Sequence, residues 1–180
     1  MLCFMIPGFS LTRQNAELEK ELVDVFLDVV RGGQFILGEN VAKLEKEIAD
    51  LCGVKYAIGV GNCSDALYLA LLACGVGPGD EVITTPFTFF ATAGAIAHTG
   101  AKPVFCDIDP VDFTMDTSRI ESLITDNTCA IVPVHVYGNV CHVEEIRRIA
   151  DKYGLKVIYD ASHAFGVRYK NIGIASFGDV

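Results

Sequence analysis

The segment Gly61-Asn62-Cys63-Ser64 joins an apolar stretch with strand character, residues 56–60, to a helical apolar pattern that begins at Ala66. The first turn of a helix has unpaired backbone N–H groups, and the positive end of the helix dipole lies at the same place. Such a strand–turn–helix junction suits a phosphate, to which the Ser64 hydroxyl can add a further donor. The segment therefore predicts an anion site, and the open question is which phosphate it holds.

A dinucleotide is the first candidate, since Gly59-Val60-Gly61-Asn62-Cys63-Ser64 is a loose G-x-G-x-x-S. Such a site needs an acidic side chain at the end of the second strand, about 20 residues further on, to hold a ribose. Asp80 and Glu81 have this spacing, but they precede the strand rather than end it. No Gly-Lys-Ser/Thr follows the turn, which excludes a P-loop. Both nucleotide alternatives are therefore disfavoured.

Pyridoxal phosphate (PLP) is the second candidate, and it needs a phosphate cup, a stacking partner, a carboxylate at its pyridine nitrogen and a lysine. A phenylalanine cluster (Phe87, Phe89 and Phe90) follows the next expected strand, and Asp160 ends another. Each residue alone has a structural reading: Ser64 or Asp65 as a helix cap, Phe89 as core, Asp160 as a buried turn residue, His163 as a structural histidine. Their conjunction at three strand ends favours PLP.

These residues must be positioned by an alternation of strands and helices that begins at residue 55. Apolar periodicity predicts strands over 56–60, 81–84, 103–107, 130–136 and 156–160, and helices over 65–74, 90–99, 117–124 and 143–153. Two further helices, over 14–30 and 41–51, precede them, and Gly32-Gly33 ends the first. This order predicts an α/β fold of three layers, a mostly parallel sheet covered on both faces, with ligands at the carboxyl ends of the strands.

The composition narrows the class of protein. A net charge of -9 over 180 residues argues against nucleic-acid binding, and no apolar run has the roughly 18 residues of a membrane span. The apolar residues 1–6 have no basic leader and are too few for a signal peptide. The seven cysteines are odd in number and have no zinc-ligand spacing, so we expect no metal and free thiols. We expect a cytoplasmic protein.

Several segments together resemble the DegT/DnrJ/EryC1/StrS family of PLP-dependent nucleotide-sugar aminotransferases. The stretch GVGNCSDALYLALL, residues 59–72, resembles the family's G-x-G-N-G-T-D-A-L-x-L-A-L segment. Similar matches follow in order at residues 77–83, 86–89, 100–105, 107–110, 131–138, 160–164 and 178–180, with residues 33–38 similar to the family's entry loop. The resemblance implies the aspartate-aminotransferase fold (fold type I): residues 1–54 as an N-terminal helical segment, 55–180 as a truncated large domain, and no C-terminal small domain.

The resemblance also implies roles for individual residues. Cys63 and Ser64 match the positions that hold the PLP phosphate, Phe89 the aromatic residue that stacks on the ring, Asp160 the carboxylate at the pyridine nitrogen, and His163 a residue near the ring's 3′ oxygen. Cys63 stands where the family usually has Gly, which would cost on the order of 1 kcal/mol if the position needs φ > 0. The Schiff-base lysine is expected beyond Val180, so no catalytic residue is assigned, and Lys170 matches a surface turn.

By resemblance, then, the chain is the N-terminal part of an enzyme that moves an amino group, with glutamate as the expected donor, to a keto-sugar nucleotide. The complete enzyme is expected to be a homodimer, and this part alone to be inactive. Two alternatives stay open: a sugar dehydratase of the same family with His in place of the lysine, and a non-catalytic remnant. His135, Tyr137 and the Phe35 loop are candidates for the substrate side, with structural roles as the alternative.

Overall fold

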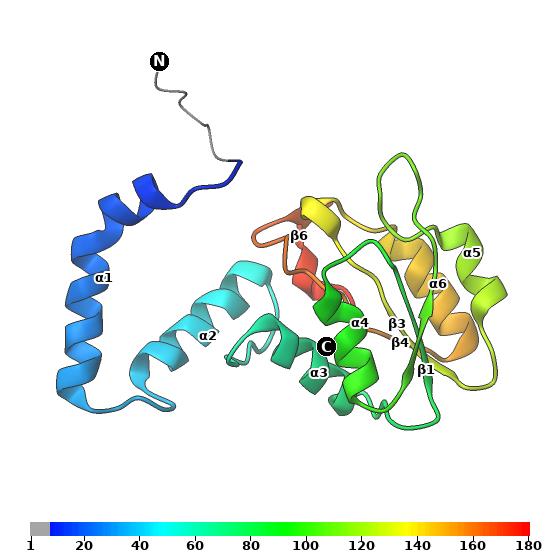
Figure 1. The fold of residues 1–180 in the computed structure, drawn as a ribbon, viewed down its shortest axis with the longest axis horizontal. Coiled ribbons are helices and arrows are strands. Elements are labelled where there is room, and N and C mark those ends of the chain that lie inside the picture. The colour runs from blue at the N-terminus through cyan, green and yellow to red at the C-terminus, as the bar shows by residue number, and fades with distance from the viewer. Residues whose placement is uncertain (1–7) are drawn as a thin grey trace, which may run out of the picture. The chain divides into compact units, whose positions relative to one another are not determined.

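The computed structural model describes residues 8–180, so the apolar residues 1–6 and Cys3 lie outside the described part. The chain forms two compact units that divide between Lys43 and Leu44 (Figure 1). In the first unit, helix α1 (Thr12–Gly32) ends at Gly33, which has φ 67° and donates its N–H to the Val29 carbonyl. The expected stop at Gly32-Gly33 is thus confirmed. Helix α2 (Glu39–Cys52) follows, and from Leu44 onward it belongs to the second unit.

The second unit contains a parallel sheet of four strands. These are β1 (Glu81–Thr84), β2 (Lys102–Phe105), β3 (Thr128–Val132) and β4 (Lys156–Val157), in the order β2-β1-β3-β4. Every neighbouring pair is parallel, as the alternation of strands and helices predicted. The helices between and around them are α3 (Cys63–Ala73), α4 (Phe90–His98), α5 (Thr117–Leu123) and α6 (Val143–Tyr153).

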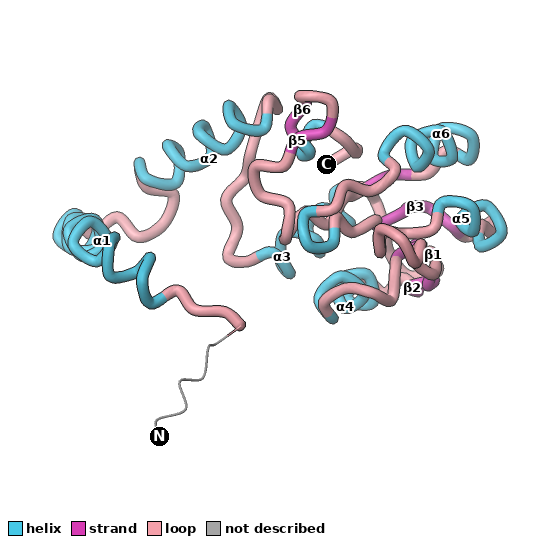
Figure 2. The backbone as a smooth tube through the Cα atoms, turned by 90° about the horizontal axis from the view of Figure 1, so that it is seen from above, coloured by secondary structure: helices cyan, strands magenta, loops and turns pink. Residues whose placement is uncertain are grey.

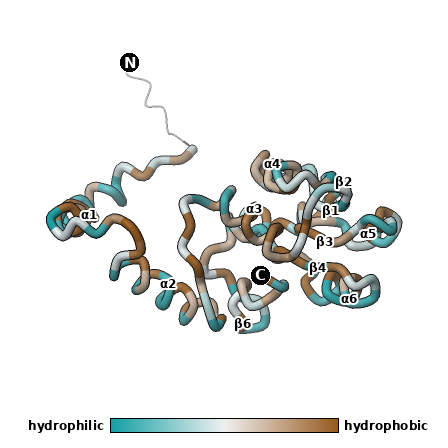
Figure 3. Tube along the Cα trace, turned by 90° about the horizontal axis from the view of Figure 1, so that it is seen from below, coloured by the Kyte–Doolittle hydropathy of each residue, from teal (hydrophilic) through white to brown (hydrophobic). Residues whose placement is uncertain are grey.

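Successive residues of the strands face opposite sides of the sheet and build two cores. Val82 packs with α3 and α4 residues such as Leu71 and Ile96, while Ile83 packs on the other face with Ile120 of α5 and Ile146 of α6. Figure 2 shows the strands between α4 and α6. Figure 3 shows that α3 is mostly hydrophobic, whereas hydrophobic and hydrophilic residues alternate along α6, as in a helix with one face toward solvent. The expected three-layer α/β arrangement is confirmed.

The expected strand over residues 56–60 is absent. Tyr56 and Ile58 are 72% and 82% exposed, and the segment pairs with no strand among residues 8–180. Its Gly59 N–H instead donates to the Glu45 carboxylate at 2.8 Å. Apolar alternation gives a segment the capacity to form a strand, but a strand also needs a partner that satisfies its backbone groups. This prediction was wrong for the described chain.

The strands expected over 130–136 and 156–160 are shorter than predicted. Pro133 has no N–H to donate, and β3 ends just before it. The pairing resumes at one bridge, Val134 with Asp160, where the Asp160 N–H donates to the Pro133 carbonyl at 2.9 Å. Asp160 therefore still lies beyond the carboxyl end of β4, paired with Val134, which follows β3.

The remaining elements are short: η1 (Val136–Gly138), the antiparallel hairpin of β5 (Arg168–Tyr169) and β6 (Ile172–Gly173), and η2 (Ile174–Ser176). Lys170 lies in the two-residue turn of the hairpin with φ 49°, so its expected place in a turn is confirmed. Within the second unit, the carbonyls of Leu51 and Cys52 accept hydrogen bonds from Arg168 and Ser176, which ties the end of α2 to the β5–β6 hairpin and to η2. None of the helices in residues 8–180 is both long and apolar enough to cross a bilayer.

Candidate functional site

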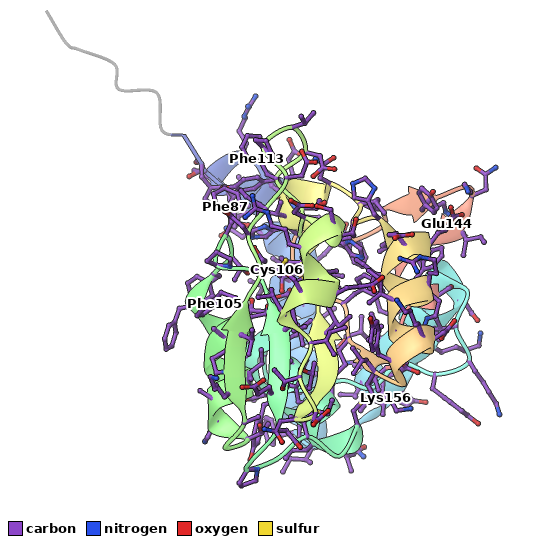
Figure 4. The ribbon with its side chains drawn as sticks, turned by 90° about the vertical axis from the view of Figure 1, so that its right-hand side faces the viewer. Phe87, Phe105, Cys106, Phe113, Glu144 and Lys156 are labelled. Atoms are coloured by element: carbon purple, nitrogen blue, oxygen red, sulfur yellow. The ribbon has the colours of Figure 1, made fainter. Side chains whose placement is uncertain are left out.

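A cavity of about 200 Å³ lies at the carboxyl ends of the strands. In Figure 4 the labels of Phe87 and Phe113 mark this end of the sheet, and Lys156, at the start of β4, marks the opposite end. The cavity is lined by all five residues predicted to contact the cofactor, namely Cys63, Ser64, Phe89, Asp160 and His163. It is also lined by Leu67, Thr88, Ala91, Val134 and Ser162. The structure thus brings together the first turn of α3 and residues that follow β1, β3 and β4.

The first turn of α3 supplies the cavity's anion-binding groups. Asn62 caps the helix: its side-chain oxygen accepts the Asp65 N–H at 2.9 Å, and its amide donates to the Asp65 carboxylate at 2.8 Å. The cap is therefore Asn62, not Ser64 or Asp65. The backbone N–H groups of Cys63 and Ser64 have no acceptor within residues 8–180. Both remain free for a ligand at the positive end of an 11-residue helix.

Cys63 fits its position without backbone strain. The non-glycine residues with positive φ lie elsewhere in the described chain, and Cys63 is the first residue of α3. Cys63 therefore does not carry the energetic cost expected for a side chain at a position with φ > 0. The thiol is exposed, and its Sγ lies 2.9 Å from the Ser162 hydroxyl.

Asp160 is the buried acid of the site, with 5% of its surface exposed. One carboxylate oxygen, Oδ1, accepts both the N–H (3.1 Å) and the hydroxyl of Ser162. The other, Oδ2, accepts the Thr92 hydroxyl at 2.8 Å. A buried carboxylate held by three donors has a fixed orientation, and it still has acceptor capacity for a group in the cavity.

Phe89 and His163 form the exposed side of the cavity. Phe89 precedes α4 and is 74% exposed, so it is not a core residue. The His163 ring stacks parallel to Tyr137, with the centroids 5.6 Å apart, and its Nδ1 accepts the Tyr137 N–H at 3.4 Å. Tyr137 has φ 53°, a left-handed conformation within η1. Phe89 and His163 thus line the same cavity as the carboxylate and the N-terminus of α3.

His135 has a structural place instead. It is fully buried and stacked on Tyr159 with centroids 4.7 Å apart, and its Nδ1 accepts the Cys141 N–H at 3.0 Å. Its Nε2 has no partner in the described structure. Burial lowers the pKa of His135 to about 4, against the opposing effect of the nearby Asp160 charge. A residue that is neutral and enclosed in this way does not reach the cavity.

Sequence reasoning assigned no role to Ser162 or Thr92. Ser162 lies two residues after Asp160, a spacing at which a hydroxyl can turn back to a carboxylate. Thr92 lies one helical turn after Thr88, and their hydroxyls are 2.8 Å apart. The spacing of these two threonines was visible in the sequence, but their contact with residue 160 was not.

The groups present match the chemistry of PLP. Two free amides and a hydroxyl at a helix N-terminus suit a phosphate, a buried carboxylate suits a pyridinium N–H, and an exposed aromatic ring suits a flat heterocycle. The cavity has no lysine in its lining. Groups of three or more metal-ligating side chains are absent from residues 8–180. The site can thus bind and orient such a ring.

Comparisons with known proteins agree in family and fold. Residues 16–180 match the model of the DegT/DnrJ/EryC1/StrS aminotransferase family. The chain is 46% identical to a UDP-2-acetamido-2-deoxy-3-oxo-D-glucuronate aminotransferase from Pseudomonas aeruginosa, over 92% of this chain and 46% of that protein.

Two solved structures extend the similarity. A DegT DnrJ EryC1 StrS aminotransferase from Brucella abortus matches with a TM-score of 0.92 and 35% identity, over 97% of this chain and 48% of that one. A structure of ntda from Bacillus subtilis with bound cofactor pmp matches with a TM-score of 0.87 and 35% identity, over 93% of this chain and 39% of that one. The chain thus spans about half the length of the proteins that it matches.

Proposed function

We propose that this chain, which belongs to the DegT/DnrJ/EryC1/StrS aminotransferase family, is the N-terminal, PLP-binding part of a sugar aminotransferase. The complete enzyme would transfer an amino group from glutamate to a keto-sugar nucleotide. The observation that carries the proposal is the convergence of the α3 N-terminus, Phe89 and Asp160 on one cavity. Its relatives' names support the substrate class, since one is a UDP-sugar aminotransferase.

Each cavity residue has a role in this proposal. The N–H groups of Cys63 and Ser64 and the Ser64 hydroxyl bind the phosphate, where the helix dipole favours negative charge. With the cofactor bound, Phe89 would stack on the ring and His163 would contact its 3′ oxygen. Asp160 accepts the pyridine N–H and so keeps the ring nitrogen protonated. When bound, PLP supplies an electron sink for chemistry at the carbon that carries the amine.

Residues 1–180 by themselves bind the cofactor without a covalent bond and do not transaminate. The reason lies in the cavity, which has no lysine in its lining. The lysine that holds the cofactor and moves protons comes from the remaining half of the enzyme, as do the small domain and the rest of the substrate site.

The complete enzyme acts in the cytoplasm as a homodimer. The free state of all six cysteines in residues 8–180 supports a reducing compartment. The many exposed apolar side chains, such as Ile58 at 82% and Phe90 at 81%, support an interface that a partner covers.

The test uses pyridoxamine phosphate (PMP), because its amine cannot form an imine with surface lysines. Its fluorescence is titrated with residues 1–180. We expect saturable binding that weakens roughly 10- to 100-fold in Asp160→Asn, where a charge-assisted hydrogen bond is lost. Ser64→Ala should weaken binding by a smaller factor. The control is Ser122→Ala, whose hydroxyl donates to the Arg119 carbonyl outside the cavity. Equal affinity in all four proteins, or no saturable binding, would overturn the proposal.

A further inference from the structure

We infer that Ser162 and Thr92 are positioning residues that aim Asp160 at the ring nitrogen, and that Cys63 connects this carboxylate to the phosphate end of the site. The inference rests on the proposed function and adds a specificity to it. One hydrogen-bonded chain runs from the first turn of α3, through the carboxylate, to the first turn of α4. It makes the cavity selective for a ring that offers one N–H.

The hydrogen-bonded chain consists of four side-chain contacts around Asp160. The Cys63 thiol lies 2.9 Å from the Ser162 hydroxyl, which bonds to Asp160 Oδ1. On the other side the Thr88 hydroxyl lies 2.8 Å from the Thr92 hydroxyl, which lies 2.8 Å from Asp160 Oδ2. All five side chains belong to the walls of the same cavity or contact a residue that does.

The number of protons on the side chains fixes the direction of each bond in the hydrogen-bonded chain. An ionised carboxylate only accepts, so the hydroxyl protons of Ser162 and Thr92 both go to Asp160. A hydroxyl has one proton, so the Cys63 thiol must donate to Ser162, and the Thr88 hydroxyl must donate to Thr92. Every donor then points toward one carboxylate, and bonds aligned in this way polarise one another.

The same count leaves one place for a ligand. A carboxylate has about four acceptor positions. Oδ1 uses two of them for the N–H and hydroxyl of Ser162, and Oδ2 uses one for Thr92. The remaining position is on Oδ2, in a group that is 5% exposed. A ring with one N–H satisfies it, and a ring with C–H at that place leaves it unpaired, which is costly in a buried site.

Cys63 extends the chain to the phosphate end. Its backbone N–H is one of the two free amides, and its thiol holds the Ser162 hydroxyl in place. Without the Cys63 thiol, the Ser162 hydroxyl loses the donor that bonds to it but keeps its own bond to Asp160. The effect of removing Cys63 should therefore be smaller than that of removing Ser162 or Thr92.

The experiment compares PMP with its carbocyclic analogue, in which C–H replaces the ring nitrogen. The measured quantity is the ratio of the two affinities, which a general loss of folding does not change. We expect residues 1–180 to prefer PMP by about 10-fold or more and Asp160→Asn to lose this preference. Ser162→Ala and Thr92→Val should each reduce it about 3- to 10-fold, and Cys63→Ala about 2-fold. Affinity for inorganic phosphate should stay unchanged in Ser162→Ala and Thr92→Val.

Two controls complete the design. Thr99→Val removes a buried hydroxyl just after α4 that donates to the Ile96 carbonyl, and it should leave the ratio unchanged. Thr92→Ser keeps the hydroxyl and should restore the ratio. If wild type shows no preference, the proposed cofactor orientation fails. If Asp160→Asn loses the preference while Ser162→Ala and Thr92→Val keep it, or Thr92→Ser fails to restore it, only the present inference is overturned.

Discussion

The burial of His135 predicts a specific loss of stability in mild acid. The ring is fully enclosed, Nδ1 is occupied by the Cys141 N–H, and Nε2 meets no acceptor among the described residues. Protonation would therefore place a charge in the core that the nearby Asp160 charge offsets only in part. The pKa falls from 6.5 to about 4. The unfolded chain, with a pKa near 6.5, takes up this proton first.

The sign and magnitude of this change in stability with pH follow from the linkage between proton binding and unfolding. Between pH 6.5 and 4 the unfolded state binds more protons at this residue, so the free energy of unfolding falls as the pH falls. The contribution is fully present above pH 6.5. With these two pKa values, the loss reaches roughly 2 kcal/mol at pH 5 and roughly 3 kcal/mol at pH 4.

The assay is urea unfolding followed by circular dichroism, since the chain has no tryptophan. Wild type is compared with His135→Asn, in which the side-chain oxygen can still accept the Cys141 N–H. The variant is expected to be less stable at pH 7.5 because it leaves a cavity, but to lose roughly 2 kcal/mol less than wild type between pH 7.5 and 5. The other histidines are the same in both proteins, so the difference between the two curves reports on residue 135. Parallel stability curves over this range would refute the reasoning.

Three further predictions concern α3, the thiols and the exposed segment 56–60. Asn62→Ala should lower the free energy of unfolding by about 1 kcal/mol, measured by urea unfolding, because α3 loses its cap. At pH 8, iodoacetamide should label the exposed Cys63, and bound PMP should slow this labelling. Cys141 should stay unlabelled because burial raises the pKa of its thiol to about 12, and rapid labelling of Cys141 in mass spectra would contradict this. Ile131→Ala should cost about 2–5 kcal/mol and Ile58→Ala less than about 0.5 kcal/mol, because only Ile131 is buried; equal costs would contradict the assignment of the core.

The sequence predicted those parts of the fold that depend on local pattern. The parallel sheet, the helices between its strands and the two faces of the core follow from apolar periodicity, as Val82 and Ile83 illustrate. Phe89 and Asp160 could be proposed because ligands gather at the carboxyl ends of parallel strands, and Cys63 and Ser64 because a helix N-terminus suits a phosphate. His163 was proposed only from the family resemblance. The functional roles of these five residues remain predictions, whereas their proximity is a feature of the structure.

Features that depend on distant partners were not predictable. The segment 56–60 has the pattern of a strand, but pattern does not report whether a partner strand lies beside it. The hydrogen bond from Thr92 to Asp160 joins residues 68 positions apart, and no local rule connects them. The cap at Asn62 was hidden because Ser64 and Asp65, which follow it, are also common caps.

A crystal structure of residues 1–180 with PMP would test the central claim most directly. The account predicts density for the phosphate at the N–H groups of Cys63 and Ser64, with the ring nitrogen within hydrogen-bond distance of the Asp160 carboxylate and the ring against Phe89. Density for PMP elsewhere on the molecule, or in this cavity with the ring nitrogen turned away from Asp160, would contradict it.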